Sequence, residues 1–100
     1  MSIVLVGGHD RMHRVYKDVG KERGHRIKVF TQMPAKFNKA IGQPDAMIVM
    51  TATVSHKMLQ VANREARKKS IPVVHCHCSG GCSLLQAVEE LERALRVDRH

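Results

Sequence analysis

Two short segments that are apolar at every position, residues 3–6 and 46–50, most constrain what this chain can fold into. An uninterrupted apolar run of this length, bounded by glycine or proline, is typical of a strand that is buried on both faces. Gly7 and Gly8 end the first run, and Pro44 shortly precedes the second. Strands buried on both faces occur in parallel sheets, so the two runs predict the centre of a parallel sheet covered by helices.

The segments around these runs alternate between strand and helix patterns. Helical periodicity follows Asp10, which is placed to cap a helix, and follows Ser55 in the same way. We expect strands at residues 3–6, 25–31, 46–50 and 71–75, and helices after Asp10, at 34–41, after Ser55 and at 84–97. The last helix gains support from two i, i+4 pairs, Glu89 with Arg93 and Glu92 with Arg96.

This alternation predicts a single Rossmann-like α/β domain over residues 1–100, a three-layer arrangement with helices on both faces of a four-stranded parallel sheet. We expect the strand order 2-1-3-4, which places the switch point between the first and third strands. Pro72 lacks the N–H that a ladder needs, so the fourth strand belongs at an edge.

Composition limits the class of protein. Apolar residues make up 43% of the chain, but only one Tyr and two Phe are present, so the core must be aliphatic. The longest apolar runs fall far short of the roughly 20 residues that span a bilayer, and the first residues lack the features of a signal peptide. We therefore expect a cytoplasmic protein with no membrane association.

The chain is basic, with a formal net charge of +8. Such a charge favours anionic partners. The lysines and arginines are spread over the helices instead of forming one tract, and few aromatic residues are present to stack on bases, so nucleic acid is the weaker expectation. A small anionic ligand and a homodimer formed through the edge strand are the other expected partners.

Three loops carry most of the polar and reactive residues. They follow the first, third and fourth expected strands, at residues 7–11, 51–56 and 75–82. Carboxyl ends of parallel strands lie at one edge of the sheet, so the three loops are expected to share one site. The candidate binding residues are His9, Asp10, Arg11, Thr51, Thr53, Ser55, His56, Ser79, Gly80 and Gly81.

The third of these loops contains all three cysteines of the chain and two of its seven histidines. Thiolate and imidazole ligands suit zinc, iron or copper better than magnesium or calcium. On an extended segment Cys76 and Cys78 lie on one side, and His75 and His77 on the other. The candidate metal ligands are His75, Cys76, His77, Cys78, Cys82 and His56. The set suits a zinc ion, an iron–sulfur cluster or haem iron, and the sequence does not choose among them.

Other readings stay open. Gly7-Gly8 with Arg11 and the hydroxyl-rich second loop would also suit a phosphate or nucleotide, although the G-x-G-x-x-G pattern is absent. Cys76 and Cys78 would also suit a thiol redox protein, although they are not spaced as C-x-x-C. His9 and His13 share a helix face only if the helix begins by His9.

The motifs Gly7-Gly8-His9-Asp10-Arg11, Thr51-Ala52-Thr53-Val54-Ser55-His56-Lys57 and Ser79-Gly80-x-x-Ser83-Leu84 resemble those of a bacterial family, domain of unknown function 2325. The resemblance covers nearly the whole chain and implies a small Rossmann-like domain. It implies that His9, Asp10, Arg11, Thr53, Ser55 and His56 belong to a shared site. The cysteines depart from the family pattern, in which the last loop is rich in Ser and Gly, so metal binding does not follow from the resemblance.

The function that we predict is binding of a transition metal or haem by a non-enzymatic module with a sensing or regulatory role. Enzymatic activity is the less favoured expectation, since Asp10 is the only carboxylate in the three loops and no nucleophile–base pair is evident.

Overall fold

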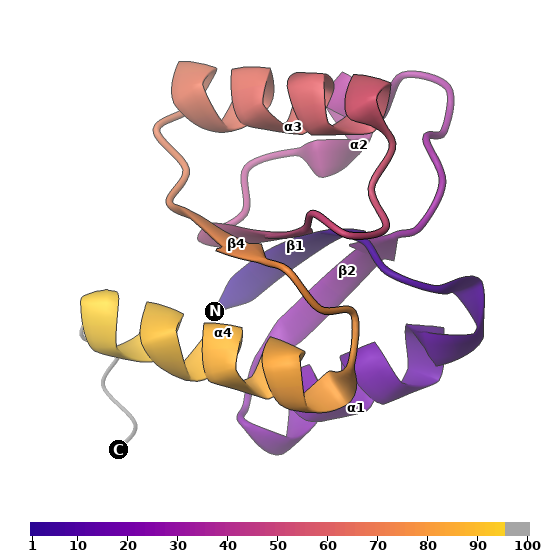
Figure 1. The fold of residues 1–100 in the computed structure, drawn as a ribbon. Coiled ribbons are helices and arrows are strands. Elements are labelled where there is room, and N and C mark those ends of the chain that lie inside the picture. The colour runs from indigo at the N-terminus through magenta and orange to yellow at the C-terminus, as the bar shows by residue number, and fades with distance from the viewer. Residues whose placement is uncertain (96–100) are drawn as a thin grey trace.

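The computed structural model describes residues 1–95 and shows strands and helices in strict alternation (Figure 1). The elements are β1 (Ser2–Gly7), a short 3-10 helix (Asp10–Met12), α1 (His13–Glu22), β2 (Arg26–Phe30), α2 (Phe37–Ile41), β3 (Ala46–Met50), α3 (His56–Lys68), β4 (Val73–Cys76) and α4 (Gly81–Ala94). All four strands are parallel, and the α/β Rossmann-like fold is confirmed.

The sheet has the order β2-β1-β3-β4, as the sequence predicts. The central strands are β1 and β3, in which Leu5 and Ile48 lie opposite each other, and Leu5 also lies opposite Val29 of β2. Pro72 immediately precedes the edge strand β4, and its carbonyl oxygen accepts a hydrogen bond of 2.8 Å from the Met47 amide. The proline therefore contributes an acceptor to the ladder at a position where a donor is not needed.

Two hydrophobic clusters fill the spaces on either side of the sheet. Side chains alternate along a strand, so Ile3 and Leu5 of β1 enter the cluster beneath α1 and α4, while Val4 and Val6 enter the cluster beneath α2 and α3. The same alternation divides β3. Figure 1 shows these two pairs of helices on opposite faces of the sheet. Burial on both faces explains why residues 3–6 and 46–50 are apolar at every position.

The helix ends differ in part from the expectations. Ser55 caps α3 as predicted, and its hydroxyl accepts a hydrogen bond of 3.2 Å from the Met58 amide. The prediction that Asp10 caps the first helix is wrong, because His9 is the residue before the 3-10 helix and the Asp10 carboxylate accepts hydrogen bonds from Thr31 and Gln32 after β2.

The last helix begins at Gly81, three residues before the expected start, and is described to Ala94. The expected pair of Glu92 with Arg96 lies outside the described residues. Glu89 and Glu92 both form salt bridges with Arg23, which follows α1. No helix within residues 1–95 is long and apolar enough to span a membrane.

A buried polar network joins α4 to the start of β2. The Glu92 carboxylate accepts a hydrogen bond from the Arg23 guanidinium, and one of its oxygens lies 2.6 Å from Nε2 of His25. Glu92 and His25 are only 7% and 3% exposed at their side chains. The Glu92 carboxylate raises the pKa of the Arg23 guanidinium further above its already high usual value. Buried charged groups are stable only when paired, so this network fixes α4 on the sheet.

We expect Glu92→Gln to lower the free energy of unfolding by about 2 kcal/mol, because the amide keeps the shape but not the charge that Arg23 and His25 contact. Urea denaturation followed by circular dichroism measures the change. Glu90→Gln, at an exposed position of the same helix, is the matched control and should change the stability by less than about 0.5 kcal/mol. Equal losses in the two variants would contradict a special role for Glu92.

Candidate functional site

The loops after β1, β3 and β4 meet at the carboxyl edge of the sheet and are joined by hydrogen bonds. The Gly8 amide donates to the Thr53 hydroxyl oxygen at 2.7 Å, and the Thr53 and Ser79 hydroxyl oxygens lie 2.9 Å apart. The Thr51 hydroxyl adds a second link between two of the loops by donating to the Cys76 carbonyl oxygen at 3.1 Å. The structure therefore brings together Gly8, Thr51, Thr53 and Ser79.

Tyr16 of α1 holds this junction in place from the side of the sheet that α1 and α4 cover. Its hydroxyl donates to the Ser79 carbonyl oxygen at 2.7 Å and accepts from the His9 amide at 3.2 Å, and the side chain is fully buried. Tyr16 lies in the helix expected after Asp10, and it is not among the predicted site residues. The sequence feature that could have identified Tyr16 is its hydroxyl, since a buried tyrosine needs a hydrogen-bond partner.

Gly8 is required at its position by both conformation and space. Its φ of +88° is a value that residues with a side chain rarely adopt. A Cβ atom there would lie 2.8 Å from the ring and hydroxyl of Tyr16. The glycine thus permits the close approach of the first loop to Tyr16. At this point the loop contacts side chains of the protein instead of being open to a ligand.

The other predicted residues of the first two loops lie apart from this junction. His9, Arg11 and His56 are exposed, and Nε2 of His56 lies 3.1 Å from the Gln60 amide nitrogen on the same helix. Within residues 1–95 no hydrogen bond or ion pair joins these three side chains to Thr53 or Ser79. The predicted shared site is therefore formed in part. Thr53 and Ser79 meet at the junction, and the side chains of these three residues lie outside it.

Asp10 and His13 both turn toward the end of β2. The hydrogen bond from Thr31 holds the pKa of the Asp10 carboxyl below its usual value. Nε2 of His13 lies 3.2 Å from the same Thr31 hydroxyl oxygen. His9 has an extended backbone and His13 is the first residue of α1, so the two histidines do not share a helix face.

The three cysteines lie in different environments. Cys76 ends β4 and is buried in the core cluster beneath α1 and α4, with its Sγ 3.8 Å from the Ser83 carbonyl oxygen. Cys78 follows in the loop and Cys82 is the second residue of α4; both are exposed. All three are free thiols.

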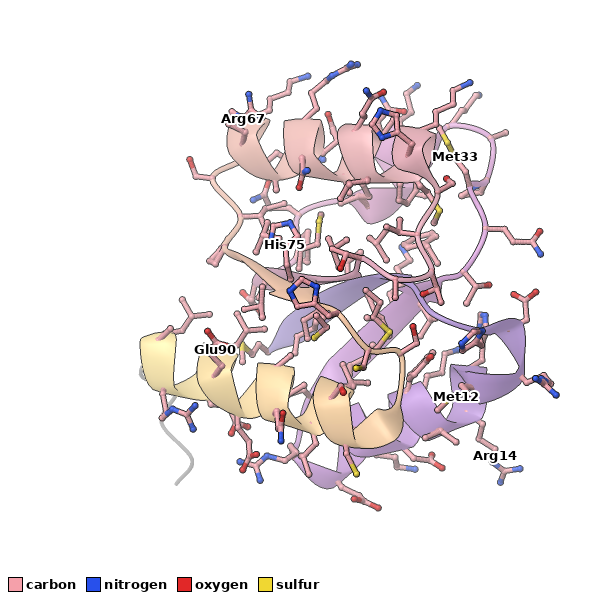
Figure 2. All side chains as sticks on the ribbon, viewed as in Figure 1. Met12, Arg14, Met33, Arg67, His75 and Glu90 are labelled. Carbon is pink, nitrogen blue, oxygen red and sulfur yellow. The ribbon has the colours of Figure 1, made fainter. Side chains whose placement is uncertain are left out.

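A cavity of about 280 Å³ lies between β4 and α4. Figure 2 locates two of its lining residues, His75 on β4 and Glu90 on α4. The full lining consists of Val74, His75, Cys76, His77, Cys78, Ser83, Gln86, Ala87 and Glu90. The cavity therefore gathers four of the six predicted metal ligands and adds Glu90, which sequence reasoning missed because it lies in the middle of an amphipathic helix. Cys82 and His56 are not part of the lining.

The electrostatics of the cavity disfavour thiolate at Cys76. Burial raises the pKa of the Cys76 thiol, and the nearby negative groups Glu90 and Cys78 raise it further. In residues 1–95 no three or more His, Cys, Asp or Glu side chains are already grouped as the ligands of a metal ion. Metal binding by this cluster stays a prediction.

We expect Tyr16→Phe to loosen the junction of the three loops, because the Ser79 carbonyl and His9 amide lose their shared partner. The cost should be about 1–2 kcal/mol in the free energy of unfolding. Hydrogen exchange should accelerate at His9 more than at Ile27 of β2, which serves as an internal reference. Uniform acceleration at both amides would contradict a local role for the hydroxyl.

Comparison with known proteins identifies a family and adds no activity. The model of one family, DUF2325, described as an uncharacterized protein conserved in bacteria, matches residues 2–91. No curated protein matches the sequence. The match includes all four strands, the three joined loops and most of α4. The chain therefore belongs to the family DUF2325.

Proposed function

We propose that this protein is a non-enzymatic module that binds a transition-metal ion in the cavity between β4 and α4, with a sensing or regulatory role. One observation carries the proposal: a single cavity is lined by two cysteines, two histidines and a glutamate. These ligand types together suit zinc, iron or copper, and they suit magnesium and calcium poorly.

The charge distribution in the cavity supports a cation. Ionised Cys76, Cys78 and Glu90 would repel one another, and this repulsion helps to raise the pKa of the Cys76 thiol. A divalent cation placed among them would replace the repulsion with attraction and would displace the thiol protons. The same groups that repel one another as anions would therefore be favourable as ligands.

Ligand binding would reshape the loop after β4. His77 and Cys78 are exposed, while Cys76 is buried, so these exposed side chains must turn toward Cys76 for all three to contact one ion. The loop between β4 and α4 also carries Ser79, which hydrogen-bonds to Thr53 and accepts from Tyr16. Metal binding would thus change the hydrogen bonds of Ser79 at the junction of the three loops. A regulatory role requires such a change away from the metal.

The size and lining of the cavity favour an ion over haem. Its volume of about 280 Å³ lies at the lower limit of cavities that enclose small organic molecules, and among residues 1–95 its only aliphatic lining residues are Val74 and Ala87. A porphyrin needs extensive apolar contact. An iron–sulfur cluster is usually held by four cysteines, and this chain has three. A zinc ion with mixed thiolate, imidazole and carboxylate ligands fits best.

The alternative of a phosphate or nucleotide site has less support. Two amide groups that would serve as donors, those of Gly8 and His9, already donate to Thr53 and Tyr16. A thiol redox function would use Cys76 and Cys78, but the raised pKa of Cys76 makes its thiol a poor nucleophile.

We expect the wild-type protein to take up about one equivalent of zinc, and Cys76→Ser and Cys78→Ser each to weaken binding at least tenfold, because a hydroxyl is a poor replacement for a thiolate ligand. Competition with a chromogenic chelator measures the affinity. Substitution with cobalt(II) gives a second readout, thiolate-to-metal charge transfer in the near ultraviolet.

Cys82→Ser is the matched control, since Cys82 is a cysteine of the same segment that does not line the cavity. It should bind zinc like the wild type. Loss of binding in this control to the same degree, or no uptake of zinc, cobalt or iron by the wild type, would refute the proposed site.

Zinc affinity should rise with pH. The folded protein holds the Cys76 proton more firmly than a free thiol does, so at neutral pH binding must displace that proton, and the displacement becomes easier as the pH approaches the raised pKa. Titrations at pH 6, 7 and 8 should show increasing affinity, with proton release detectable in weakly buffered solution. A pH-independent affinity would contradict thiolate ligation.

A further inference from the structure

The positive charge of this protein is concentrated on one side of the sheet. The layer formed by α2, α3 and their loops (residues 31–45 and 51–70) carries seven cationic side chains: Lys36, Lys39, Lys57, Arg64, Arg67, Lys68 and Lys69. It has two carboxylates, and both are engaged: Asp45 accepts from the Ser2 amide and Glu65 forms a salt bridge with Lys69.

The opposite layer is electrically balanced. The part of the chain that forms α1, α4 and their loops (residues 8–24 and 77–95) holds equal numbers of cations and carboxylates. Its carboxylates are Asp10, Asp18, Glu22, Glu89, Glu90 and Glu92. The excess charge therefore belongs mainly to the α2/α3 side, which is a property that the total of +8 does not reveal.

Most of the cations on the α2/α3 side are available to a partner. All except Lys69 are exposed, and in the described part of the chain none of these exposed cations forms a salt bridge. Figure 2 shows nitrogen-tipped side chains projecting outward along α3, with Arg67 toward one end of the helix. A row of unpaired cations on a rigid helix attracts polyanions at long range.

The two helices also enclose a groove that concentrates this charge. A cavity of about 380 Å³ lies between α2 and α3, where Lys36, Arg64 and Lys68 surround the apolar side chains of Phe37 and Val61. Glu65 also lines the groove, and its carboxylate is paired with Lys69, so three cations in the lining outnumber one neutralised carboxylate and the local field is positive. The Asn38 amide in the same groove supplies a neutral donor for an oxygen ligand.

We propose that the α2/α3 side binds the phosphate backbone of double-stranded DNA without reading its sequence. Lys57 and Lys68 are separated by about 16 Å along the axis of α3, at a rise of about 1.5 Å per residue. One strand of B-form DNA presents a phosphate about every 3.4 Å of its axis, so the length of α3 corresponds to about five phosphates of each strand, of which those on the facing side can be contacted.

One feature favours a duplex over a single strand. Binding of single strands relies on aromatic side chains that stack on exposed bases. Phe37 is buried and packs edge to face against the half-buried Phe30, with ring centroids 5.1 Å apart, so neither ring offers an open face for stacking on this side. The proposal is independent of metal binding, since none of its residues lines the cavity at β4.

The test uses fluorescence anisotropy with a 20-base-pair DNA duplex of arbitrary sequence, at several salt concentrations. The wild-type affinity should fall about 100- to 1,000-fold between 50 and 200 mM salt if four to six phosphates are contacted. The triple variant Arg64→Gln, Arg67→Gln, Lys68→Gln should bind at least tenfold more weakly, and the slope of log affinity against log salt should decrease by about two to three.

The matched control removes the same charge from the opposite layer. Arg14→Gln, Lys17→Gln, Lys21→Gln alters three exposed positions of α1 and should bind DNA within about threefold of the wild type. Circular dichroism establishes that both variants are folded. Equal weakening in both variants would mean that net charge, and not this face, binds DNA, and it would overturn the proposal.

Two further arms identify the partner. Vesicles containing phosphatidylserine and a duplex RNA of the same length should bind more weakly than DNA. Binding to anionic vesicles but not to DNA, or to RNA but not to DNA, would overturn the proposal, as would the absence of any binding at 50 mM salt.

Discussion

Burial of both faces of β1 and β3 is the constraint on which the rest of this structure depends. Each of residues 3–6 and 46–50 in these strands enters one of two hydrophobic clusters, so a helix pair is needed on each side. With β1 and β3 at the centre, the connections after them pass to opposite directions of the sheet. That arrangement brings the loops after β1, β3 and β4 to one edge, where Gly8, Thr53 and Ser79 are hydrogen-bonded.

In the joined loops, polar side chains form hydrogen bonds with the protein's own backbone. Tyr16 and Thr53 satisfy backbone amides and carbonyls that would otherwise require water or a ligand. The place where the three loops meet is therefore a structural junction. The candidate metal ligands lie beside it, in the cavity between β4 and α4. Cys76 belongs to both, because its carbonyl oxygen accepts from Thr51 and its thiol lines the cavity.

The sequence predicts the fold well because the strongest signals are local. Continuous apolar runs identify the buried strands, Ser55 identifies the start of α3, and Pro72 identifies an edge strand. The errors concern residues whose role depends on distant partners. Asp10 has the right type for a cap, but it contacts Thr31 and Gln32, which lie more than 20 positions away. Periodicity cannot reveal that Tyr16 reaches Ser79 or that Glu90 joins the cysteine cavity.

The unequal burial of the cysteines has a consequence for oxidation. Cys76 is shielded by the core and by its raised pKa, whereas Cys78 and Cys82 are open to solvent and to a neighbouring molecule. Oxidising conditions would therefore reach these exposed thiols first, and a disulfide between two protein molecules would produce covalent dimers. Such dimers would report thiol exposure and not the association of edge strands, so the native oligomeric state has to be measured with the thiols kept reduced.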